Sequence, residues 1–239
     1  MAGEAKYKRV LLKLSGEALM GDKPYGIDTP TLERLVSEIL AGKGTGVQFV
    51  VVIGGGNIFR GLSGAAEGLD RATGDYMGML ATLINALALQ EAFIRRGHEP
   101  FTTNAFTVAS VVPPYERRAA LRNLELGKVL LLAGGTGRPF FTTDTAAALR
   151  AIELNCDILL KGSHIDGVYD SDPEINPSAK RYNTLSYTDA IDMKLKIMDL
   201  TAFSLCYEHR LPLVVFDIRA PGNLQRVLAG DMSIGTFVK

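Results

Sequence analysis

The sequence contains no tryptophan, only two cysteines and three histidines, and its charges balance to a formal net charge of zero. Cys156 and Cys206 lack the spacing of a metal cluster or a redox pair, so we expect both to be buried thiols. The balanced charge excludes a global field that would attract a polyanion, and no basic stripe indicates a nucleic-acid partner. Any anionic ligand must therefore be bound by a local site.

Targeting segments and two familiar nucleotide motifs are also missing. The first residues lack a signal-type apolar region, and no apolar run approaches the roughly 20 residues that cross a bilayer. We therefore expect a soluble, cytoplasmic protein without a membrane partner. The patterns GxxxxGK[ST] and, after a strand, GxGxxG do not occur, which excludes a P-loop kinase and disfavours a dinucleotide dehydrogenase.

The 239 residues, 47% of them apolar, suffice for one large domain. Short apolar runs alternate with segments of helical period, which predicts an α/β fold: a three-layer αβα sandwich around a mainly parallel sheet. Strands are expected over residues 9–14, 48–53, 101–103, 129–132, 158–161, 213–216 and 236–238. Helices are expected from an N-cap at Thr29, and over residues 75–96, 114–126, 144–155, 187–194, 198–209 and 222–229. The inward face of the 75–96 helix is predicted to hold Met77, Leu80, Ala81, Ile84, Leu87 and Ala88.

Glycine follows four of the predicted strands, at Gly16, at residues 54–56, at residues 134–137 and at Gly162. Ligands of open α/β sheets bind beyond the carboxyl ends of the strands. Glycine at these ends lets backbone N–H groups approach phosphate oxygens. One such turn would be unremarkable, but four on one sheet edge predict a phosphate site. The irregular stretch over residues 162–182 is the expected ligand-covering loop.

Charged side chains lie close to these turns. Lys13 and Lys161 interrupt apolar strands near their carboxyl ends, where an ammonium group needs a partner or a polar cleft. Cations in this place stabilise charge on a moving phosphoryl group, so the lysines favour phosphoryl transfer. Arg60 could bind an acceptor phosphate through two hydrogen bonds of its guanidinium group. Asp75 could be a helix N-cap, a contact to a ribose hydroxyl group, or both. At the next predicted helix start, Thr143 or Asp144 could serve as the cap.

Read in order, these motifs resemble those of bacterial uridylate kinases, which are members of the amino acid kinase family. They cover nearly the whole chain: LKLSGEAL at residues 12–19, VIGGGNIFRG at 52–61, GDYMGMLAT at 74–82, PFFTTD at 139–144, DGVY at 166–169 and Met198-Asp199. The resemblance implies one amino acid kinase domain over residues 1–239, with an acceptor-binding part over about 1–155 and an ATP-binding part over about 156–239. It also implies ATP with Mg²⁺ as donor, UMP as acceptor and a homohexamer, and it suggests GTP as activator and UTP as inhibitor.

The resemblance also implies roles for individual residues. For ATP and its phosphates these are Lys13, Leu14, Ser15, Gly16, Gly56, Arg60, Ser163, Tyr169 and Asp172. For UMP they are Gly55, Asp75, Thr136, Gly137, Arg138, Pro139, Phe140, Phe141, Thr142 and Thr143. Lys13, Lys161, Asp144 and Asp199 would organise charge at the transfer site, and no protein metal site is implied.

Two positions depart from the family pattern. Arg138 stands where asparagine is common, and Gly162-Ser163-His164 replaces a different polar run. Alternatives to a UMP kinase are another acid or phosphate kinase of the same fold, such as a carbamate, acetylglutamate or isopentenyl phosphate kinase, and a non-catalytic nucleotide- or oxyanion-binding protein. Arg60 and the Thr142-Thr143 pair favour a phosphate-bearing acceptor, and the presence of both lysines favours catalysis.

Overall fold

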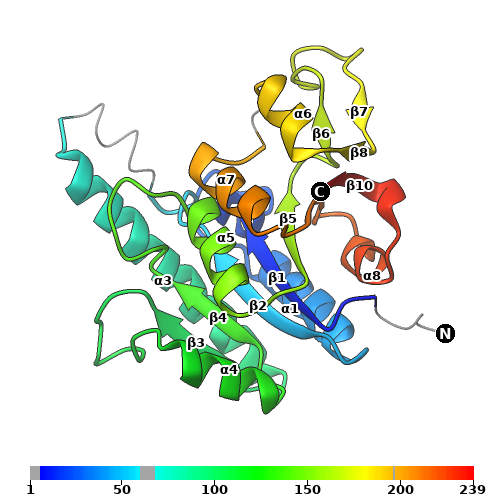
Figure 1. Cartoon of the computed structure of the whole chain (residues 1–239). Coiled ribbons are helices and arrows are strands. Elements are labelled where there is room, and N and C mark those ends of the chain that lie inside the picture. Colours follow the sequence, from blue (N-terminus) through cyan, green and yellow to red (C-terminus); the bar gives the residue numbers. More distant parts are fainter. Residues whose placement is uncertain (1–5, 60–67, 196) are drawn as a thin grey trace.

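The computed structural model describes residues 6–59, 68–195 and 197–239 and is built around one large sheet (Figure 1). In spatial order the strands are β3 (Phe101–Asn104), β4 (Leu130–Ala133), β2 (Gln48–Ile53), β1 (Arg9–Leu14), β5 (Ile158–Ser163), β9 (Leu213–Asp217), β10 (Gly235–Val238) and β8 (Thr184–Leu185). The strands from β3 to β9 pair in parallel, whereas β10 pairs antiparallel with β9. The predicted mainly parallel sheet is confirmed.

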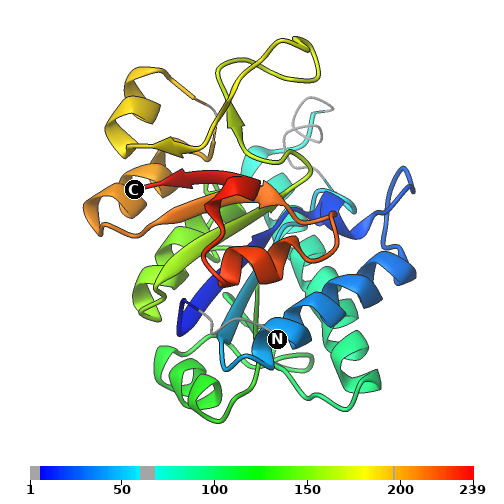
Figure 2. The ribbon, with the colours of Figure 1, turned by 90° about the vertical axis from the view of Figure 1, so that its right-hand side faces the viewer.

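Helices cover both faces of the sheet (Figures 1 and 2). One hydrophobic core contains residues of α1 (Thr29–Lys43), α3 (Arg71–Arg95) and α8 (Asn223–Leu228). The other contains residues of α4 (Arg117–Glu125), α5 (Thr143–Glu153), α6 (Tyr187–Asp192) and α7 (Leu200–Glu208). The short 3-10 helices η1 (Gly16–Leu19) and η2 (Met232–Ile234) follow β1 and α8. Cys156 and Cys206 are free and buried, as predicted.

Strand pleating decides where the two lysines point. Val10, Leu12 and Leu14 pack into the core of α1 and α3, whereas Leu11 packs into the opposite core. Side chains alternate along a strand, so Lys13 lies on the same face as Leu11, which is the face covered by α5. Lys13 is the register partner of Lys161 on β5. The sheet therefore presents two ammonium groups next to each other at its carboxyl edge.

Several predicted element boundaries are wrong by a few residues. The N-cap of α1 is Asp28, whose carboxylate accepts from Thr31 N (3.0 Å), rather than Thr29. Helix α3 begins at Arg71 instead of Asp75, because Asp70 caps it by accepting from Thr73 N (3.0 Å). The stretch predicted to be irregular contains a two-stranded antiparallel sheet of β6 (Val168–Tyr169) and β7 (Arg181–Tyr182).

The predicted inward face of α3 is also partly wrong. Ala81 is buried, but Met77, Leu80 and Ile84 are 38%, 45% and 50% exposed. Apolar residues occur on both sides of this helix, so the pattern could not tell which side faces the sheet. The buried residues are Gly74, Met79, Ala81, Thr82, Leu83, Asn85, Ala86, Leu89, Ala92 and Phe93.

Helix α3 is also long and apolar enough to cross a membrane, judged by length and composition alone. The sequence-based expectation that no such run exists was therefore too strict. Half of its most apolar window is buried inside the protein, and the buried face includes the polar side chains of Thr82 and Asn85. This half of the helix is part of the protein's hydrophobic core.

Candidate active site

A carboxylate links the two strand lysines. Lys13 Nζ lies 2.7 Å from Asp144 Oδ1, and Lys161 Nζ lies 2.8 Å from Asp144 Oδ2. All three side chains are largely buried: Lys13 is 9% exposed, Lys161 18% and Asp144 13%. Lys161 Nζ also donates to Ile197 O (2.5 Å). The group of three carries two positive charges against one negative charge, which leaves a surplus suited to an anionic ligand.

The protonation of this cluster follows from burial and charge. Burial alone would raise the pKa of Asp144, but the charges of Lys13 and Lys161 outweigh it and hold the pKa below its ordinary value of 3.8. Burial lowers the pKa of Lys161; Asp144 acts to raise it and Lys13 to lower it further, and the net shift is downward. Asp144 is therefore ionised at neutral pH.

Helix α5 begins beside the lysines because Thr142, rather than Thr143 or Asp144, caps it. Thr142 Oγ1 accepts from Asp144 N (3.0 Å) and donates to Asp199 Oδ2 (2.5 Å). Asp199 also accepts from Thr145 Oγ1 (2.9 Å) and caps α7 by accepting from Ala202 N (3.0 Å). Asp199 therefore joins the starts of α5 and α7. Its contacts within the described chain are those of a positioning residue.

The loop before α5 is held by α3. Phe140 adopts a φ of 71°, which is uncommon for a non-glycine residue. Phe140 N donates to Asp75 Oδ2 (2.7 Å), and the Asp75 carboxylate also pairs with Arg71 Nε (2.9 Å). Arg71 in turn lies 5.7 Å from the centre of the Phe140 ring. Asp75 therefore positions this loop rather than capping the helix, and sequence reasoning missed Arg71, which lies one helical turn before it.

Other residues predicted for the acceptor surround the same loop. Thr136 Oγ1 accepts from Arg138 N (3.2 Å) and donates to Arg138 O (3.2 Å), which closes a tight turn. Phe140 and Phe141 are 68% and 48% exposed. The residues predicted for UMP at 136–143 thus form one continuous loop beside Asp144.

Two glycine turns meet near Lys13. A Cβ on Gly16 would lie 2.4 Å from Asn57 Oδ1 and 2.7 Å from Gly56 N, so the turns after β1 and β2 touch. A Cβ on Gly55 would lie 2.7 Å from Gly78 O, which shows that this glycine also allows α3 to approach the sheet. Arg60, predicted for the phosphates, lies outside the described residues.

A cavity of about 640 Å³ opens at the carboxyl edge of the sheet, and Lys13 and Lys161 are part of its lining. It falls in the size range of small-molecule and cofactor sites. The predicted donor residues that line it are Lys13, Ser15, Ser163, Tyr169 and Asp172, and Lys161, predicted for the transfer site, lines it as well. The side chain of Leu14, also predicted for the donor, is buried in the core, and Leu14 O accepts from Gly54 N (2.8 Å). A second hollow of about 580 Å³ between α6 and α7 is lined in part by Asp144 and shares Lys161 and Ile197 with the first.

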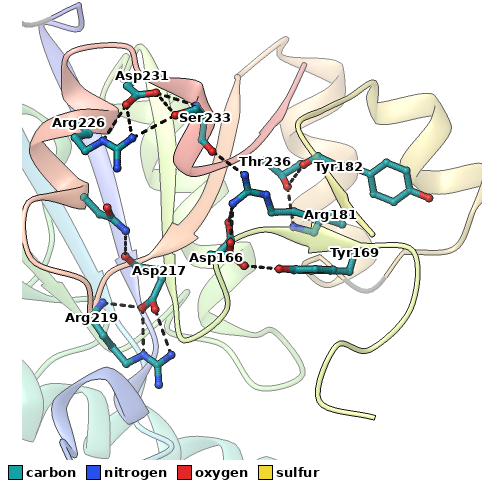
Figure 3. Close-up of polar contacts among 12 residues, drawn as sticks. Asp166, Tyr169, Arg181, Tyr182, Asp217, Arg219, Arg226, Asp231, Ser233 and Thr236 are labelled. Carbon is teal, nitrogen blue, oxygen red and sulfur yellow. Dashed lines mark hydrogen bonds and ion pairs between the residues drawn. The ribbon is translucent and has the colours of Figure 1, made fainter. Parts of the chain in front are cut away.

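Side-chain contacts shape the wall of this donor cavity (Figure 3). Tyr169 Oη donates to Asp166 Oδ1 (2.6 Å), and Asp166 Oδ2 pairs with Arg181 Nη1 (2.6 Å). Arg181 Nη2 also donates to Ser233 O (2.7 Å). The predicted nucleoside contact Tyr169 is therefore fixed through Asp166 and Arg181, two residues to which sequence reasoning assigned no positioning role.

A buried hydroxyl group links both strands of the β6–β7 sheet to the large sheet (Figure 3). Thr236 on β10 is fully buried, and its Oγ1 accepts from Val168 N (2.8 Å) and donates to Tyr182 O (2.5 Å). His164, one of the departures from the family pattern, is half exposed and lies 3.7 Å from Glu174 at the cavity.

Replacing Asp144 by Asn should lower the free energy of unfolding at neutral pH by about 3–5 kcal/mol, because two buried ammonium groups lose their shared carboxylate. The folded-state pKa of Asp144 lies below 3.8. The carboxylate therefore stabilises the protein above that pH, and its contribution is lost as pH falls and the group is protonated. Urea unfolding at pH about 7 and about 3 measures both effects.

The matched control is Asp192→Asn, at an exposed position on α6. It should change the free energy of unfolding by less than about 0.5 kcal/mol. An Asp144→Asn variant that is no less stable than this control would show that the lysines do not depend on the carboxylate.

Comparison with known proteins agrees with this geometry. Residues 8–217 match the amino acid kinase family. A UMP kinase from Bacillus anthracis has 38% sequence identity and a TM-score of 0.94, covering 98% of this chain and 96% of that one. A UMP kinase from Ureaplasma parvum has 35% identity and a TM-score of 0.92, covering 98% and 99%. A uridylate kinase from Archaeoglobus fulgidus has 27% identity and a TM-score of 0.75, covering 96% and 99%.

The resemblance read from the sequence motifs is therefore confirmed over nearly the full length of the chain. The chain belongs to the amino acid kinase family.

Proposed function

We propose that this protein transfers the γ-phosphoryl group of ATP to UMP, forming ADP and UDP. The observation that carries the proposal is the pair of lysines bridged by Asp144: both lysines line the donor cavity, and Asp144 directly follows residues 136–143 in the chain. The similarity to two UMP kinases over nearly the full chain supports UMP as the acceptor.

The arrangement suits an in-line transfer. A phosphate oxygen of UMP attacks the γ-phosphorus, the bond to the bridging β–γ oxygen breaks, and ADP leaves with that oxygen. The attacking phosphate is already anionic at neutral pH, so no general base is needed. Lys13 and Lys161 stabilise the charge that spreads over the moving phosphoryl oxygens. Asp144 keeps the two ammonium groups together and correctly oriented.

Magnesium would act mainly through the nucleotide. The described residues contain no group of three or more His, Cys, Asp or Glu side chains placed to hold a metal ion. Mg²⁺ is usually bound through one or two carboxylates together with substrate phosphates. An ion delivered with ATP therefore does not need a larger group of protein ligands. When bound, the ion neutralises phosphate charge; the protein's own contribution is the lysine pair.

The two parts of the chain divide the substrates between them. We assign the acceptor to the N-terminal part, about residues 1–155, because the 136–143 loop and its anchor Asp75 lie there. We assign ATP to about residues 156–239, which supply most of the cavity lining; Lys13, Ser15 and Glu17 reach it from the other part. Cytoplasmic location and regulation by GTP and UTP stay predictions from family resemblance.

We also propose self-association into a homohexamer. Tyr76, Met77, Leu80, Ile84 and Ile94 on α3 are between 38% and 50% exposed and lie along the helix face that turns away from the sheet. Exposed apolar residues gathered on one helix face mark an interaction surface, and a second copy of the chain is the occupant that the family resemblance implies.

The first test is substrate choice. Coupled measurement of ADP release should show UMP as the preferred acceptor over CMP, carbamate and acetylglutamate, and excess chelator should abolish the activity. Equal kcat/KM for UMP and CMP would contradict the acceptor assignment. Nucleotide binding without ADP production would favour a binding protein on the same fold.

The second test concerns the lysines. A cation about 4 Å from a developing negative charge interacts by about 4 kcal/mol at an effective dielectric near 20. If this interaction is realised only in the transition state, Lys13→Ala and Lys161→Ala should each lower kcat by on the order of a thousandfold. Asp75→Ala should instead act mainly on the KM for UMP, by releasing the acceptor loop. Steady-state kinetics on folded variants measures the difference.

Lys8→Ala, at an exposed position just before β1, is the matched control and should leave kcat within about twofold of the wild type. If both active-site variants kept kcat within about threefold and changed only the KM for ATP, the lysines would be binding residues and the proposed mechanism would be wrong.

The third test is assembly. Light scattering of the wild type should give six times the chain mass of 25.8 kDa. Ile84→Glu should yield smaller species, because a charge at the centre of this apolar face of α3 resists burial. Leu126→Glu, at a position that is 71% exposed beyond α4, should keep the wild-type mass. A wild-type protein with the mass of a monomer would contradict the proposed homohexamer.

A further inference from the structure

The buried face of α3 carries polar side chains that the reaction itself does not use. Thr82 is 2% exposed and Asn85 is 0% exposed, and both lie on the side of the helix that packs against the sheet. Polar groups in such a place are costly unless each finds a partner. Their partners include backbone groups of two different glycine turns.

Thr82 holds the turn at residues 134–137. Its Oγ1 accepts from Gly134 N (2.7 Å) and donates to Met79 O (2.7 Å). Gly134, Gly135 and Gly137 have φ values of 77°, 58° and 78°, so the turn has a conformation that few other residues would adopt. The turn leads directly into the acceptor loop, and the hydroxyl group of Thr82 fixes it at its first residue.

Asn85 holds the turn at residues 54–57 through Asn57. Asn57 Nδ2 donates to Asn85 Oδ1 (3.0 Å), and Asn85 Nδ2 donates to Asn57 Oδ1 (2.7 Å). The second donor of each amide is also used: Asn85 Nδ2 reaches Gly54 O (2.8 Å), and Asn57 Nδ2 reaches Gly26 O (2.9 Å). The pair thus clamps the turn against α3 at the point where it touches Gly16.

The same helix face also carries Asp75, which binds Phe140 N. Asp75, Thr82 and Asn85 are spaced by seven and three residues, which places them in one row along a helix. The row contacts three segments that are 31 to 65 residues away in the sequence. One rigid helix therefore sets the distances between the acceptor loop and the turns next to Lys13.

We propose that Thr82 and Asn85 are positioning residues that hold the 134–137 and 54–57 turns in register with the lysine pair. This inference rests on the proposed UMP kinase activity. Small displacements of a reacting group cost a large part of the rate advantage of a bound geometry. Loss of either contact should therefore reduce catalysis more than its small net effect on stability suggests.

Thr82 allows a clean test because two substitutions separate shape from hydrogen bonding. Thr82→Val keeps the shape without the hydroxyl group and should lower kcat/KM for UMP by at least about tenfold, while the KM for ATP stays within about twofold. Thr82→Ser keeps the hydroxyl group and should restore kcat/KM to within about threefold of the wild type. Thr102→Val, at a buried β3 threonine whose hydroxyl has no partner among the described residues, should leave the kinetics unchanged.

Amide hydrogen exchange at Gly134 gives a readout that does not depend on activity. It should be slow in the wild type and in Thr82→Ser, and at least about tenfold faster in Thr82→Val. Unchanged exchange in Thr82→Val, or equal losses for UMP and ATP, would overturn the assignment of Thr82. If the wild type did not phosphorylate UMP, the proposed substrate would be wrong. Hydrogen exchange at Gly134 would then still test whether Thr82 holds the turn.

Asn85 is tested as one half of a pair. Asn85→Leu and Asn57→Leu should each lower kcat by at least about tenfold, and the double variant should be no slower than the worse single variant, because the two amides act as one unit. Thermal unfolding of the variants, run in parallel, confirms that each is folded at the assay temperature. Additive losses in the double variant, or single variants with wild-type kcat, would overturn the assignment of the amide pair.

Discussion

The structure depends on an imbalance of charge inside its sheet. Strand register places Lys13 next to Lys161, and Asp144 forms an ion pair with each of them. Without that carboxylate, two like charges would face each other in a nearly dry interior. With it, the group is stable but still carries one surplus positive charge. This surplus charge is the physical basis of the proposal that the two lysines bind the transferring phosphoryl group.

The need to place Asp144 between the two lysines explains how α5 and α7 are arranged. Asp144 must enter from the first turn of α5, so the start of that helix has to be fixed relative to the strands. Thr142 caps the helix, and Asp199 holds Thr142 and Thr145 while capping α7. A carboxylate near two helix N-termini is favoured electrostatically, so the contact that fixes the geometry also stabilises both helices.

Much of this could be predicted from the sequence, for physical reasons that are local. Lys13 and Lys161 each precede a glycine turn near the carboxyl end of a strand, which predicted that they share one sheet edge, and the register confirms it. The pattern of α3 misled for an equally local reason: apolar residues lie on both sides, and burial goes to the side with the small and polar residues that let the sheet approach. Hydrophobic periodicity shows that a helix face is apolar, but it does not show which other element packs against that face.

What the sequence could not supply are contacts between distant segments through single polar atoms. Thr82 and Gly134 are 52 residues apart, and Val168 and Thr236 are 68 apart. No periodic pattern marks such a threonine, because its side chain resembles that of any buried β-branched residue until the partner is known. These contacts nevertheless determine the site, because strands such as β6 and β7 are two residues long and cannot fix a loop by sheet pairing alone. The large sheet therefore sets where the lysines lie, and buried hydroxyl and amide groups set where the loops lie relative to them.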